Sequence, residues 1–178
     1  MSAPAAGRYV GQAIKRKEDP RLLTGHGRYL DDVVLPRMVH AAFVRSDLPS
    51  AVIRSIDVQE ALALEGVVAV LTGADLNPGA GTMQPSMMAD NPDAVVPPLT
   101  PLANGDVRFV GDPVAIVVAE SRAIAEDAAE LVVVDYEPRD AVASIEAALA
   151  DGAPLVHPEL GSNVAMELAL PEDPELEA

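Results

Sequence analysis

The chain of 178 residues contains no cysteine and no tryptophan, and it has only three tyrosines and two phenylalanines. Without cysteine it can form neither a disulfide nor a cysteine-ligated zinc or iron–sulfur site. The shortage of aromatic side chains argues against the stacking platforms that bind single-stranded nucleic acid. Its three histidines, His26, His40 and His157, stand far apart in the sequence, so we expect no self-contained metal site.

Long apolar runs are missing as well. The N-terminus has no apolar core of signal-peptide length, and no window approaches the ~20 apolar residues of a membrane-spanning helix. We therefore expect a soluble, cytoplasmic protein without a membrane span. Apolar residues nevertheless make up 49% of the chain. They are mainly Ala, Val and Leu, which suits an α/β or α+β packing of β-branched strands against Ala-rich helices.

Charge is unevenly distributed along the chain, whose net charge is −16. Residues 1–54 hold nine basic and five acidic residues, a net charge of +4, whereas the remainder carries −20. Nucleic acid would be repelled by most of this surface. The acidity itself is typical of a solvated face.

The basic N-terminal segment suggests a contact with another domain or subunit. Lys15, Arg16, Lys17 and Arg21 lie there in a stretch with little hydrophobic periodicity. We predict that these four residues form a partner interface. The alternative is that the segment folds back on the acidic surface of its own chain.

Composition and periodicity divide the chain into three parts. Residues 1–36 are predicted to be an irregular arm with turns at 19–20 and 25–27. The main domain is expected at 37–163, and 164–178 should hold a last strand and an acidic terminal segment or linker.

Hydrophobic periodicity predicts strands at 39–46, 51–56, 67–73, 107–111, 114–119, 132–137 and 162–170. It predicts helices at 57–66, 121–131 and 144–150. Strand–helix–strand thus occurs twice, at 51–72 and 114–137. The expected fold is α+β, with the two short helices packed on one mixed sheet.

Side-chain positions allow more specific predictions for two of these helices. Asp57 and Glu60 have the spacing of a capping box at the start of the first. In the second, Ile124 and Leu131 fall on one face and are predicted to point into the core, whereas Glu126 falls on the opposite face.

A long segment at 77–101 contains six prolines and three methionines and has no regular period. It is either a mobile surface loop or a second docking element, because methionine-rich segments adapt to partner surfaces.

Candidate chemistry is weak throughout the sequence. Gly111 precedes a predicted strand rather than a helix N-terminus, so "RFVGDPVAIVVAES" predicts a turn and not a phosphate-binding loop. Asp31 and Asp32 are adjacent and would point to opposite sides of an extended chain. Turn capping is the expected role of this pair. No catalytic, cofactor-binding or metal-ligating residue is predicted.

Several ordered blocks resemble a known family. They are "RKEDPRLLTGHGRYLDD", "RMVHAAFVRS", "AVIRSIDVQEALALEGVVAVLTGADL" and "PLANGDVRFVGDPVAIVVAESRAIAEDAAELVVVDYEP". Together they resemble the N-terminal α/β hammerhead domain of the molybdenum-binding large subunit of the xanthine dehydrogenase/aldehyde oxidase family. The arm is most similar to that of carbon monoxide dehydrogenase large chains.

The resemblance implies a non-catalytic structural and subunit-docking domain within an oxidoreductase. It implies a molybdopterin cytosine dinucleotide-type molybdenum cofactor on later domains of the large subunit, and 2Fe-2S clusters and FAD on partner domains or subunits. No catalytic or cofactor-binding residue carries over to this chain, which should be inactive alone. The alternative function is a free-standing protein-binding module that keeps the hammerhead fold.

Overall fold

The structure is a computed structural model that describes residues 12–83, 94–95, 97 and 99–166. The chain divides into two compact units, Met1–Met38 and Val39–Ala178. The middle of the predicted 77–101 loop and the acidic terminal segment lie outside the described residues.

The described part of the first unit is not wholly irregular. It contains a short helix, α1 (Asp19–Leu23), and a 3-10 turn over Leu30–Asp32. The turn predicted at 19–20 is therefore wrong. Pro20 stands in the first turn of α1, where its missing N–H has no helical partner to lose and its fixed φ favours the helix. The second predicted turn is present, and Gly25 adopts a φ of 73° there.

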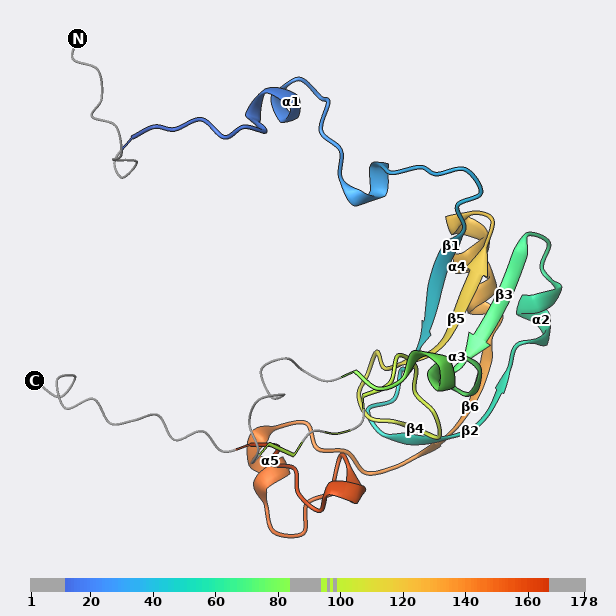
Figure 1. The fold of residues 1–178 in the computed structure, drawn as a ribbon. Helices are drawn as coiled ribbons and strands as arrows, with labels where there is room; N and C mark the ends of the chain where they lie inside the picture. The colour runs from blue at the N-terminus through green and yellow to red at the C-terminus, as the bar shows by residue number, and fades with distance from the viewer. Residues whose placement is uncertain (1–11, 84–93, 96, 98, 167–178) are drawn as a thin grey trace, which may run out of the picture. The chain divides into compact units, whose positions relative to one another are not determined.

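The second unit is built on two three-stranded sheets (Figure 1). The first sheet has the order β1-β5-β3 and is formed by β1 (His40–Arg45), β5 (Pro113–Ala119) and β3 (Val67–Thr72). The second has the order β4-β2-β6 and is formed by β4 (Asp106–Val107), β2 (Ala51–Asp57) and β6 (Val133–Pro138). Every strand pairing among the described residues is antiparallel.

The strand–helix–strand units connect the two sheets. One runs from β2 through α2 (Gln59–Ala63) to β3, and the other from β5 through α4 (Arg122–Glu130) to β6. Because each unit places its two strands in different sheets, neither produces a parallel pair. The α+β class is confirmed, but the single mixed sheet is replaced by two antiparallel ones. The helices α2 and α4 contact each other and pack on the first sheet, as predicted.

Two clusters of buried side chains form the core. One joins Val117 of β5 and Val70 of β3 to Ala61 of α2 and Ala128 of α4. The other joins Val114 of β5 to Ala51, Ala103 and Val107. Every buried member of the two clusters is Ala or Val, in keeping with the composition of the chain.

The helix α4 agrees closely with its prediction. The Ser121 hydroxyl caps it by accepting the Ile124 N–H at 3.3 Å. Leu131, just after the helix, packs against the first cluster, and Ile124 is half-buried while Glu126 is exposed. The prediction is confirmed for Leu131, whereas Ile124 lies at the edge of the buried face, whose centre is formed by Ala125 and Ala128. The short helix α5 (Ile145–Leu149) also forms, capped by Ser144.

The predicted capping box of the first helix does not form. Asp57 is still paired in β2, so its extended backbone delays the helix, and α2 begins at Gln59 after Val58. The Asp57 carboxylate accepts the Gln59 N–H at 3.0 Å instead. A capping box forms at the start of the next helix, α3, where Asp75 accepts the backbone N–H and the hydroxyl of Thr72.

Three further boundaries differ from the predictions. The helix α3 (Gly73–Ala80) extends into the predicted loop, with Pro78 inside it. The strand predicted at 107–111 ends at Val107, because the chain then winds into a turn in which the Asp112 carboxylate accepts the Arg108 N–H at 3.0 Å. Residues 162–166 form no strand, and the rest of that predicted strand lies outside the described residues.

Candidate functional site

The four predicted interface residues lie in or next to α1, and all four are exposed. Arg21 forms an ion pair with Glu18 within the same unit. Among the described residues, no acid forms an ion pair with the side chains of Lys15, Arg16 or Lys17. Within the described structure, Glu18 therefore neutralises the charge of Arg21, and the charges of Lys15, Arg16 and Lys17 have no ion-pair partner.

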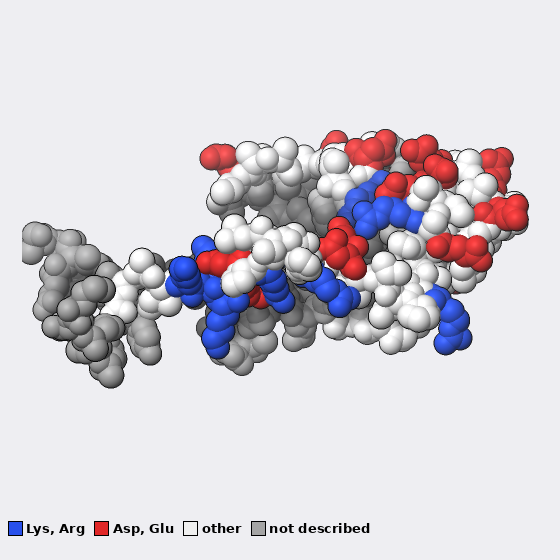
Figure 2. Space-filling model, turned by 90° about the horizontal axis from the view of Figure 1, so that it is seen from above, with Lys and Arg blue, Asp and Glu red and all other residues white. Residues whose placement is uncertain are grey.

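Charge separates the two units in the structure as it does in the sequence. Figure 2 shows the basic side chains concentrated along the described part of the first unit, and acidic side chains spread over the second. Screened charges of this kind act at a range of about 8–10 Å at physiological salt. The first unit thus presents a local positive charge on a protein whose total charge is −16.

The weak candidates for chemistry have structural roles. Asp32 accepts the backbone N–H of Tyr29 at 2.9 Å and so closes the 3-10 turn, which confirms the capping role predicted there. Gly111 adopts a φ of 95° in the turn before β5, and its N–H donates to the Ser46 carbonyl at 2.7 Å. That glycine shapes a turn, as predicted, and faces no helix N-terminus.

The described residues contain no group of three or more His, Asp or Glu side chains placed to hold a metal ion. His26 lies beside the Thr24 hydroxyl, and His157 lies beside the Glu159 carboxylate at 3.2 Å. Neither pair has the donor number of a metal site.

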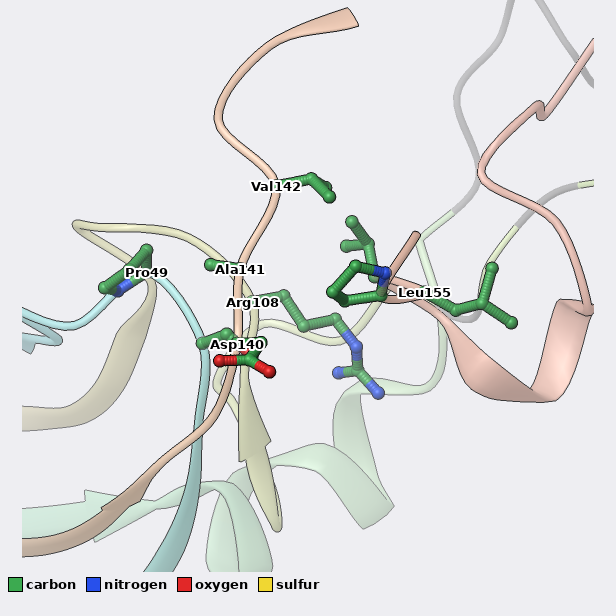
Figure 3. Close-up of a pocket in the computed structure, with 9 residues that line it drawn as sticks. Pro49, Arg108, Asp140, Ala141, Val142 and Leu155 are labelled. Carbon is green, nitrogen blue, oxygen red and sulfur yellow. The ribbon is translucent and has the colours of Figure 1, made fainter. Parts of the chain in front are cut away.

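A pocket that sequence reasoning missed surrounds Arg108 (Figure 3). Its walls come from four segments: the turn after β1, the turn after β4, the chain after β6 and the loop before Pro158. Two adjoining hollows meet there, the larger of about 540 Å³. Figure 3 shows the Arg108 side chain extending between the Asp140–Val142 segment and Leu155. The sequence offers one indication of this pocket, which is that Arg108 is one of three basic residues after position 54.

The guanidinium of Arg108 is loosely partnered. Its Nη2 lies 4.0 Å from Asp106 Oδ2 and 3.8 Å from Glu159 Oε1, both beyond hydrogen-bond distance. Its buried Nε has no hydrogen-bond partner among the described atoms. By contrast, Arg139 forms a close ion pair with Asp106 at 2.9 Å. Arg108 therefore retains donor capacity directed at a partly enclosed space.

Nearby carboxyl groups respond to this environment. Burial raises the pKa of Asp112 above its usual value, against the opposing effects of the Arg108 N–H and of the Arg108 and His157 charges. The exposed Glu159 has a lowered pKa because its carboxylate accepts hydrogen bonds from its own backbone N–H and from His157. The residues that line the two hollows include no histidine, so Ser50 has no imidazole base among them. The pocket suits recognition of a hydrogen-bond acceptor better than catalysis.

The described ends of the 77–101 segment are held together. Asn77 donates its side-chain amide to the Leu102 carbonyl at 2.8 Å, and the Leu102 N–H donates back to Asn77 at 3.3 Å. Met83 pairs with Leu99 through a backbone hydrogen bond of 2.7 Å. These contacts close the base of the segment. A third, more apolar hollow of about 500 Å³ lies beside it, lined in part by Phe109 and His157.

Comparisons of the sequence and of the structure with known proteins point to the same group of relatives. Residues 24–140 match the family model of the aldehyde oxidase and xanthine dehydrogenase a/b hammerhead domain. The chain is 39% identical over 165 residues to the nicotine 6-hydroxylase large subunit of Paenarthrobacter nicotinovorans, covering 93% of this chain and 20% of that one. It is 44% identical over 161 residues to the carbon monoxide dehydrogenase large chain of Afipia carboxidovorans, covering 89% and 19%.

Among solved structures, quinoline 2-oxidoreductase from Pseudomonas putida 86 is similar with a TM-score of 0.80 and 47% identity, over 88% of this chain and 20% of that one. The chain thus spans about a fifth of the length of the relatives it matches. Within the described residues, no helix is long and apolar enough to cross a membrane.

Proposed function

This chain belongs to the aldehyde oxidase and xanthine dehydrogenase a/b hammerhead domain family, and from that membership we propose that it is a structural and docking domain of a molybdenum-dependent oxidoreductase large subunit. The observation that carries the proposal is the asymmetry of coverage. The relatives match nearly all of this chain, but the chain accounts for only about a fifth of each. It corresponds to one domain among several.

The residues present do not fit a cysteine-ligated iron–sulfur cluster or a metal ion held by protein side chains alone. The sequence has no cysteine, and the described residues hold no three-donor cluster. The complete enzyme would carry a molybdopterin cytosine dinucleotide-type cofactor on other domains of the large subunit, with 2Fe-2S clusters and FAD on partners. We derive no chemical step through these groups in this chain. In this proposal the chain contributes a folded domain and contact surfaces to the enzyme, and no reactive group.

Two features supply the proposed contacts to the remaining large-subunit domains and to the iron–sulfur and flavin subunits. One is the basic cluster of Lys15, Arg16, Lys17 and Arg21, of which three charges have no ion pair among the described residues. The other is the 77–101 segment, whose base is closed by Asn77 and Leu102. The closed base fixes the described ends of the segment to the domain.

Metal and flavin analysis of two preparations tests the proposal. The 178-residue chain, produced alone, should contain no molybdenum, iron or flavin. The same chain, tagged in the genome of its source organism, should be recovered joined to or together with a protein that holds all three. Stoichiometric molybdenum in the isolated chain would show that the cofactor assignment is wrong. Recovery from its own cells without molybdenum, iron or flavin would instead support a free-standing binding module.

A further inference from the structure

One face of the first sheet carries six apolar side chains in two adjacent rows, and none of the six belongs to either core cluster. The strand register aligns Phe43, Ile116 and Leu71 in one row across β1, β5 and β3. It aligns Ala41, Val118 and Ala69 in the next row. Side chains alternate along a strand. These six therefore lie opposite the row of Ala42, Val117 and Val70, in which Val117 and Val70 belong to the first core cluster.

The six side chains, which we call the outer face, remain accessible in this unit. Phe43 is 47% exposed and Ala41 is also exposed, whereas the other four are half-buried. Figure 1 shows α4 behind this sheet, and no described helix of the second unit covers the upper part of the opposite side. Arg45 lies at the border, with its guanidinium 5.3 Å from the Phe43 ring centre.

The second sheet provides an internal comparison. Ile56 and Val134 point into the core, so their neighbours Ser55 and Asp135, which pair across β2 and β6, point away from it. Asp57 pairs with Val133 on that side. The solvent side of the second sheet is thus largely polar, as expected for a half-buried antiparallel sheet. The outer face of the first sheet departs from this rule in a chain that has 28 acidic residues.

Its size indicates what kind of partner covers it. With strands about 4.8 Å apart and alternate residues about 6.7 Å apart, six side chains in two rows cover roughly 200 Å². A stable contact between separate proteins buries about 800 Å² on each partner. Contacts between domains of one polypeptide can be smaller, because the covalent connection already holds the two surfaces at high effective concentration. The outer face is too small to hold a separate subunit by itself.

We propose that the outer face packs against another domain of the same large subunit, within the four-fifths of the relatives' length that this chain does not cover. This rests on the proposed function and names the surface through which the domain is fixed. The partner surface is apolar, since burying the six side chains against a charged surface would cost free energy. Arg45 remains at the rim, where arginine is common in interfaces.

Thiol labelling tests the proposal directly, because the chain has no cysteine of its own. Ala41→Cys places one thiol on the outer face, and Ser55→Cys is the matched control on the polar side of the second sheet. Each variant is labelled with a maleimide in the isolated chain and in the complete large subunit without its other subunits. Mass spectrometry of the labelled peptide gives each rate. We expect Cys at position 41 to react at least tenfold more slowly in the large subunit, and the control to react equally in both.

Three outcomes would overturn the proposal. Equal rates at position 41 in both preparations would show that the outer face stays in solvent. A slow rate already in the isolated chain would mean that the chain covers the face itself. Protection that appears only after the iron–sulfur and flavin subunits are added would assign the face to a separate subunit. The proposed function fails independently, when the chain is found in no molybdenum-containing protein.

Discussion

Gly73, the first residue of α3, stands where a larger residue has no room. A Cβ atom at this position would lie 2.4 Å from the Ala103 carbonyl oxygen and 3.1 Å from its carbon. Both are backbone atoms, and the Ala103 N–H is itself bonded to the Pro113 carbonyl at 2.7 Å. Gly79, in the same helix, would place a Cβ with nothing within 4 Å. The surroundings of Gly73 thus require a glycine, whereas the space around Gly79 would accept a larger side chain.

Alanine substitution should separate them. Gly73→Ala is expected to lower the free energy of unfolding by about 2–3 kcal/mol, because the clash is with backbone that must shift. Gly79→Ala should raise it by up to ~1 kcal/mol, since alanine restricts the unfolded chain and favours the helix. Urea denaturation of the two variants beside the parent chain measures both. Equal stability of the two variants would contradict the close approach of α3 to Ala103.

Single residues show what a sequence can predict and where it stops. Spacing alone placed Leu131 correctly and Ile124 at the edge of the buried face, because helical period is a local property. Gly73 and Arg108 were not found, since their surroundings are formed by segments distant in sequence. The contact of Gly73 is with Ala103, and the pocket of Arg108 needs the chain after β6.

At the scale of elements, the phase of α4 can be tested on its two faces. Ile124 is half-buried near Gly66, and Glu120 Oε2 lies near the same point. Ile124→Asp would place a carboxylate among apolar groups and beside that acid, and it should lower the free energy of unfolding by about 2–4 kcal/mol. Glu126→Ala, on the exposed face, should change it by less than ~0.5 kcal/mol. Similar denaturation midpoints for the two variants would mean that the helix is rotated from this orientation.

Elements with a strong period were predicted well, and those decided by distant contacts were not. The strand β5 and the helix α4 match their predicted ranges to within a residue or two. The strand predicted over 107–111 failed because the apolar residues Phe109 and Val110 enter a turn held by Asp112 and Gly111. The assignment of strands to two sheets was also missed, since no local pattern states which strands pair.

For the whole molecule, the fold was predicted from the resemblance of the sequence blocks to the hammerhead family. The relatives match most of this chain, but the chain matches only about a fifth of their length, which supports the proposal that it is one domain of a larger protein. The outer face could not have been predicted, because the sequence of β5 is apolar at every position between its ends and gives no sign of which face is covered. The register with β1 and β3 supplies that information.

The proposed role of the basic cluster predicts an effect on assembly rather than on folding. Replacing Lys15, Arg16, Lys17 and Arg21 together with alanine removes four positive charges, of which only Arg21 has an ion pair among the described residues. An exposed pair of this kind contributes at most about 1 kcal/mol, so the melting temperature of the chain should hardly change. Long-range attraction to acidic partners should be lost.

The measurement is the rate at which the proposed large subunit associates with the proposed iron–sulfur and flavin partner subunits over a range of salt concentrations. We expect the fourfold variant to associate about tenfold more slowly at low salt, and its rate to depend less on salt than that of the parent protein. Arg54→Ala is the control, because it removes an exposed cation that already pairs with Glu137. Unchanged association together with a large loss of stability in the isolated chain would show that these cations serve the chain's own fold, and that the docking role assigned to them is wrong.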